Sequence, residues 1–121
     1  MKNAINWFEI FVTDLDRALG FYEQALGRSL RREEFGGEPT AVFPADEHAV
    51  AGSLVQRATR KPSSEGVLVY LDTAGQMASV LARVPAAGGA VVLPRTSIGP
   101  MGWIATIRDT EGNVVGLHEE A

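Results

Sequence analysis

Residues 7–27 read WFEIFVTDLDRALGFYEQALG, the pattern of a buried strand that runs directly into an amphipathic helix. The apolar run over residues 5–12 predicts the strand, and Asp14 is a typical N-cap residue whose carboxylate can accept hydrogen bonds from the first turn of a helix. Apolar side chains then recur every three or four residues, and Gly27 follows the last of them. One residue does not fit a buried strand, because Glu9 is ionisable.

Side chains alternate between the two faces of a strand, so the direction of Glu9 can be predicted. We expect one face to carry Phe8, Ile10 and Val12. The opposite face would carry Trp7, Glu9 and Phe11.

The same pattern returns about half of the 121-residue chain later. Residues 67–71 predict a second strand, the apolar spacing from Met77 to Val84 predicts a second helix, and Gly88 and Gly89 end it. This offset indicates a duplicated unit rather than an array of short repeats.

Three more strands are predicted after each helix. In the first half they cover residues 30–35, 40–43 and 50–57, with a turn at 36–39. In the second half they cover 90–93, 103–108 and 114–119, separated by the loop PRTSIGPMG and the turn at 109–112. The predicted fold is α+β: one domain of two βαβββ modules, 1–57 and 67–121, joined by a linker at 58–66. Each module is a curled mixed sheet with one helix, and two such sheets would enclose a cup.

The composition limits the function classes. The chain is 45% hydrophobic and 21% charged, has no cysteine and carries a net charge of −4. We therefore expect no disulfide and no nucleic-acid partner, and the absence of a long apolar run predicts no membrane partner. The N-terminal residues lack a secretory signal, so the expected location is the cytoplasm. The one basic cluster, Arg57, Arg60 and Lys61, is interpreted as a solvated loop.

Three segments together resemble the vicinal oxygen chelate superfamily, which includes glyoxalase I, extradiol dioxygenases, fosfomycin-resistance enzymes and bleomycin-resistance proteins. They are VTDLDRALGFYEQALG at 12–27, LARVPAAGGAVVLP at 81–94 and IRDTEGNVVGLHE at 107–119. The resemblance implies tandem βαβββ modules of the glyoxalase/bleomycin resistance/dihydroxybiphenyl dioxygenase-like type. Because such modules are often paired between two chains, it also implies a homodimer.

The resemblance gives four positions for metal ligands in the metal-dependent members. A His seven residues before the Asp that opens the helix falls on Trp7, and a Glu seven residues after the Asp of the last turn falls on Gly116. The other two fall near Val67 and near Gly52 or Ser53. Trp, Gly and Val offer no suitable side-chain donor for a divalent ion. No metal ligand and no cofactor are therefore predicted, and a divalent metal is disfavoured.

Two ionisable residues are candidate catalytic groups. Glu9 is either a structural carboxylate paired with an Arg or placed at a pocket edge, or a pocket carboxylate that binds a polar ligand or acts as a base. His118 shares the expected face of Gly116, and is either a structural residue or the partner of Glu9 in an acid–base pair. His48 is expected on the surface. The predicted ligand-binding residues are Trp7, Glu9, Phe11, Ser53, Trp103 and His118.

The function expected from these observations is binding of a small organic molecule in a metal-free cup between the modules. One alternative is an enzyme in the same cup, either a metal-dependent lyase, isomerase or dioxygenase with shifted ligands or a metal-free acid–base catalyst. Another is an interaction protein whose pocket is vestigial. The loop at 97–102 is either a mobile flap over the cup or an ordinary connection, and the turn DTEGN is given no catalytic role.

Overall fold

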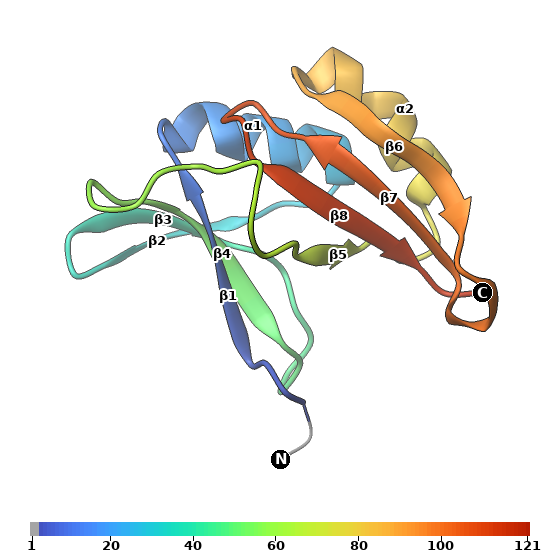
Figure 1. The fold of residues 1–121 in the computed structure, drawn as a ribbon. Coiled ribbons are helices and arrows are strands. Elements are labelled where there is room, and N and C mark those ends of the chain that lie inside the picture. Colours follow the sequence, from blue (N-terminus) through green and yellow to red (C-terminus); the bar gives the residue numbers. More distant parts are fainter. Residues whose placement is uncertain (1–2) are drawn as a thin grey trace.

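The computed structural model describes residues 3–121 as two four-stranded mixed sheets with the helices together on one side (Figure 1). The first module contains β1 (Trp7–Val12), α1 (Leu15–Leu26), β2 (Arg31–Phe35), β3 (Glu38–Val42) and β4 (Ala51–Gln56). The second contains β5 (Tyr70–Asp72), α2 (Met77–Ala87), β6 (Ala90–Ser97), a short 3-10 helix (Gly99–Met101), β7 (Trp103–Arg108) and β8 (Val114–Glu119).

Both sheets have the same topology. The strand orders are β1-β4-β3-β2 and β5-β8-β7-β6, and in each the first strand pairs parallel with the last while the other pairs are antiparallel. The predicted tandem βαβββ fold is therefore confirmed. The sheets do not close on each other, and β1 and β5 are edge strands.

Helix α1 begins and ends as its sequence predicts. The Asp14 carboxylate accepts a hydrogen bond from the Arg17 backbone N–H at 3.1 Å, and Gly27 has a φ of 70°, which a residue with a Cβ rarely adopts. The buried face of the helix joins one core cluster with the helix-facing side chains of the strands. Each large apolar side chain in this core contributes about 1.5–3 kcal/mol relative to exposure.

Two element boundaries differ from the prediction. Strand β5 begins at Tyr70 rather than at residue 67, and β6 continues through Pro94 to Ser97, where a loop was predicted. Pro94 is tolerated because β6 is an edge strand whose pairing with β7 shifts register on both sides of Leu93. Neither helix has the length and apolar character needed to cross a membrane among the residues described.

The turn DTEGN joins the second module to the first. Asp109 is buried and accepts a hydrogen bond from the Tyr22 hydroxyl of α1 at 2.8 Å, and the Asn113 side-chain amide donates to the Phe11 carbonyl at 2.8 Å. Burial, and then the neighbouring Asp109 carboxylate, raise the pKa of Tyr22 well above its usual value. The hydroxyl therefore stays protonated and able to donate.

Candidate functional site

Strand β1 places its side chains as the alternation predicted. Ile10 and Val12 are buried in the core under α1, whereas Trp7, Glu9 and Phe11 lie on the face that carries no helix. This face is called the open face of the sheet. The Trp7 side chain is large and apolar, yet the residue remains 43% exposed.

A cavity of about 860 Å³ lies between the two edge strands, and we call it the inter-module groove. Its lining includes Trp7 and Glu9 from β1, and Tyr70 and Asp72 from β5. Val67 and Leu68, just before β5, add further apolar surface. Because β1 and β5 belong to different modules, both modules contribute to this groove.

Glu9 is one of two carboxylates that hold Arg57. The Arg57 guanidinium donates to Glu9 at 3.2 and 3.3 Å and to Glu38 at 2.7 and 2.9 Å, and it lies 5.2 Å from the centre of the Phe11 ring. Hydrogen bonding to Arg57 lowers the pKa of Glu38, and the same bonds raise the pKa of Arg57. Arg57 follows the end of β4 in a loop, as interpreted from the sequence, but its half-buried side chain is held by the two carboxylates rather than free in solvent.

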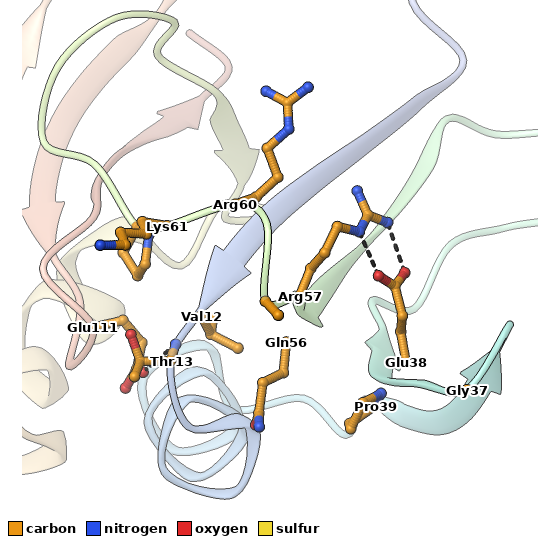
Figure 2. A pocket seen from close by; sticks show the side chains of 12 residues that line it. Val12, Thr13, Gly37, Glu38, Pro39, Gln56, Arg57, Arg60, Lys61 and Glu111 are labelled. Carbon is orange, nitrogen blue, oxygen red and sulfur yellow. Dashed lines mark hydrogen bonds and ion pairs between the residues drawn. The ribbon is translucent and has the colours of Figure 1, made fainter.

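Arg57 and Glu38 also line a second cavity, of about 830 Å³, which we call the linker pocket (Figure 2). It lies where β1 and β4 end, between the turn that precedes β3 and the linker. Figure 2 shows Arg60 pointing away from the Arg57–Glu38 pair, and its guanidinium lies 5.9 Å from the Phe11 ring centre. The guanidinium groups of Arg57 and Arg60 therefore both lie beside the Phe11 ring, but only that of Arg57 bonds to Glu38.

Ser53 lies beside Glu9 in the β1–β4 ladder but is completely buried. Its hydroxyl has no hydrogen-bond partner among residues 3–121. The side chain contributes to neither cavity, so a ligand in the groove would not touch it without movement of the residues above.

The structure separates Trp103 and His118, which lie on opposite faces of the second sheet. Trp103 shares the face of Ala105 and Ile107 and packs against the core, with Arg95 stacked 3.6 Å from its ring centre. The sequence predicted Trp103 as a ligand-binding residue together with Trp7, but the structure does not place it on the open face. His118 is on the open face and its Nε2 lies 2.7 Å from the Met101 carbonyl oxygen.

Glu9 and His118 lie in different sheets. Glu9 pairs with Arg57, and His118 contacts the Met101 carbonyl. No hydrogen bond joins them in the part of the chain that the structure describes. Tyr70 and Asp72 line the groove although neither was predicted as a site residue. The signal that could have identified them is the repetition of aromatic–x–carboxylate, WFE at 7–9 and YLD at 70–72, in the first strand of each module.

The residues at the four family ligand positions do not fit a divalent metal. Trp7 fills one position, and Gly116 fills another. A Cβ added at Gly116 would lie only 2.3 Å from the Tyr70 ring, which occupies the space of a longer side chain there. Within residues 3–121 no group of three or more His, Cys, Asp or Glu side chains is arranged to hold a metal ion.

Known structures share this architecture. The structure of UcmS2 is 25% identical with a TM-score of 0.67, and 98% of each chain is covered. A glyoxalase I variant from Zea mays is 25% identical with a TM-score of 0.70, and the match covers 93% of this chain but 44% of that one. A glyoxylase/bleomycin resistance protein/dioxygenase domain from Frankia sp. EAN1pec is 17% identical with a TM-score of 0.73 over the full length of both.

A comparison with curated proteins gave no match. Residues 4–117 match the family described as the Glyoxalase/Bleomycin resistance protein/Dioxygenase superfamily, and this match covers nearly the whole chain. The duplicated topology and the structural neighbours agree with that match. The chain therefore belongs to the Glyoxalase/Bleomycin resistance protein/Dioxygenase superfamily.

Proposed function

We propose that this protein binds a small organic molecule with a flat apolar body in the inter-module groove, without a metal ion. The observation that supports the proposal most directly is the groove itself, whose volume of about 860 Å³ is within the range of small-molecule sites. Large exposed apolar side chains line it: Ile5, Trp7, Val67, Leu68 and Tyr70.

Trp7 and Tyr70 would supply most of the binding energy. They are 43% and 44% exposed, so each still presents apolar surface that a ligand can remove from water. Burying such surface contributes about 25 cal/mol per Å², and aromatic contacts add about 0.5–1.5 kcal/mol. A ligand with a ring system would gain both the free energy of apolar burial and that of the aromatic contacts.

The enzyme alternative has less support. An acid–base pair of Glu9 and His118 needs the two side chains within hydrogen-bond reach of one substrate. Glu9 binds Arg57 and His118 contacts the Met101 carbonyl, in different sheets. Binding without reaction is therefore the function that the contacts favour.

We further propose that the functional form is a homodimer located in the cytoplasm. All eight residues of edge strand β6 are exposed, including apolar Val91, Val92 and Leu93, and a second chain would cover such a strand. Light scattering at micromolar concentration tests the dimer. It should report twice the 13.0 kDa chain mass, whereas a monomer would contradict the proposed dimer.

A thermal-shift screen of aromatic metabolites on chelator-treated protein tests the binding function. A ligand at 100 times its dissociation constant should stabilise the folded state by about 2.7 kcal/mol. The Trp7→Ala variant should lose most of that shift. The matched control is Phe35→Ala, because Phe35 is also an exposed aromatic strand residue but lines neither cavity.

Two results would contradict the proposal. One is a shift that survives in Trp7→Ala but disappears in Phe35→Ala, which would place the ligand outside the groove. The other is a shift that appears only after a divalent ion is added, which would make the site metal-dependent.

A further inference from the structure

Each of the two edge strands presents an aromatic side chain and a carboxylate to the inter-module groove. Trp7 and Glu9 are two residues apart in β1, and Tyr70 and Asp72 are two residues apart in β5. Side chains two apart in a strand lie on one face, and all four of these line the same cavity. The two modules thus place a duplicated motif around one space.

Small neighbours leave each aromatic ring accessible. Across the ladder Trp7 is beside Ala51, and Tyr70 is beside Gly116, whose absent Cβ leaves room for the ring. An aromatic face attracts a cation through its quadrupole, and a carboxylate two residues along the strand adds charge attraction. The motif is therefore suited to a positively charged group attached to an apolar body.

The charges around the groove leave an excess of negative charge. Glu9 shares Arg57 with Glu38, so these three groups together carry one negative charge. Asp72 accepts a backbone hydrogen bond from Ala74 at 2.8 Å and has no ion pair among residues 3–121. Among residues 3–121, Arg28 is the one cationic side chain in the lining, and its guanidinium donates to the Asp72 carbonyl oxygen at 3.0 Å.

From this arrangement we infer that the ligand of the inter-module groove is an organic cation, such as an amine or a guanidine carried on an aromatic or aliphatic body. The inference rests on the proposed function, since it names the charge of the molecule that the groove binds. The aromatic pair would hold the body of the ligand, and Glu9 and Asp72 would face its cationic group.

Three probes with the same ring system separate charge from shape: 1-naphthylmethylamine, 1-naphthalenemethanol and 1-naphthoic acid. Dissociation constants are measured by NMR titration at pH 7, where the amine is protonated and the acid ionised. We expect the amine to bind about tenfold more tightly than the alcohol, about 1.4 kcal/mol, and the acid to bind most weakly. Glu9→Gln and Asp72→Asn should each reduce the preference for the amine about threefold.

Matched controls isolate the groove charges. Glu34→Gln removes an exposed carboxylate from β2 and Asp46→Asn removes one from a loop, and neither residue lines the groove or contacts Arg57. Both should keep the full preference for the amine. Melting temperatures of all four variants show whether a lost preference reflects lost folding.

The outcomes distinguish the two proposals. Equal binding of the three probes, or tighter binding of the acid, would overturn the cationic ligand and leave the groove as a binding site. An equal loss of amine preference in Asp46→Asn and Glu9→Gln would also overturn it. If none of the three probes binds, the groove is not an aromatic-ligand site, and the proposed function fails together with this inference.

Discussion

At the scale of single residues, Glu111 joins the second module to the start of α1 in the first. Its carboxylate accepts hydrogen bonds from the Thr13 and Asp14 backbone N–H groups at 2.9 and 2.8 Å, and from Arg17 at 2.7 and 3.0 Å. Burial alone would raise the pKa of Glu111, but the bonds from Arg17, the backbone and Thr110 outweigh it and lower the pKa to about 2. The side chain is fully shielded from solvent.

This depressed pKa predicts an acid-sensitive junction. The ionised form is the one that is bound, so its contribution is complete above the ordinary pKa of 4.5 and is lost as the pH falls from there towards 2. The difference corresponds to about 3 kcal/mol of unfolding free energy. Urea denaturation between pH 7 and pH 2.5 should show this loss in the natural protein.

The Glu111→Gln variant should be less stable by about 2–3 kcal/mol at pH 7, because the charge that offsets burial is gone. Its stability should also fall less steeply below pH 4.5. Glu47→Gln is the control, since Glu47 is an exposed loop residue. Identical pH dependence in the natural protein and Glu111→Gln would show that another carboxylate governs the junction.

Among the elements, the parallel strand pairs β1–β4 and β5–β8 each pack an aromatic ring against a glycine. A Cβ added at Gly52 would lie 2.3 Å from the Phe8 ring, and one at Gly116 would lie 2.3 Å from the Tyr70 ring. The Phe8 ring packs against the core, and both rings also line the inter-module groove. Both glycines are therefore needed for packing rather than for an unusual backbone conformation.

Gly116→Ala should destabilise the protein by about 1–3 kcal/mol, because the Tyr70 ring or the strand must move. Gly20→Ala is the control: Gly20 lies within α1 with nothing within 4 Å of its missing Cβ, so this change should stabilise by up to about 1 kcal/mol. Thermal unfolding followed by circular dichroism measures both. A Gly116→Ala protein as stable as the parent would mean that Tyr70 is not held against Gly116.

Local sequence patterns predicted the elements whose signals are local. Helix α1 is an example, because the signals for its start, buried face and end all lie within its own sequence: the Asp14 cap, the apolar spacing and Gly27. The end of β6 was missed because Pro94 argues against a strand, and only its place at a sheet edge makes it acceptable. Whether a strand lies at the edge or in the centre of a sheet depends on the order of the strands. No local sequence pattern contains that order.

The candidate site was predictable only in part, for a related reason. Alternation along β1 gave the face of Trp7 and Glu9 correctly. The face of Trp103 follows from its register with Glu119, whose carboxylate accepts a hydrogen bond from the α2 backbone at Met77. The partnership of Arg57 with Glu9 joins residues 48 positions apart, so it depends on the β1–β4 ladder rather than on neighbouring sequence.

On the scale of the whole molecule, the two modules meet through their helices and leave their edge strands facing a groove. Contacts between α1 and α2, the Arg83 hydrogen bond to the Ala25 carbonyl at 3.0 Å, and the DTEGN turn hold the modules together. In the described residues 3–121, no strand pairing joins the two sheets. This arrangement leaves space for a ligand between the edge strands of the two modules.

The most direct test of the account is a residue-by-residue NMR titration of chelator-treated protein with 1-naphthalenemethanol. This neutral probe tests the metal-free groove independently of ligand charge. We predict that the largest chemical-shift changes fall on Trp7, Tyr70, Val67 and Leu68, with saturable binding in the absence of any divalent ion. Changes confined to Arg60 and Lys61 in the linker pocket, or changes that require an added divalent ion, would contradict the account.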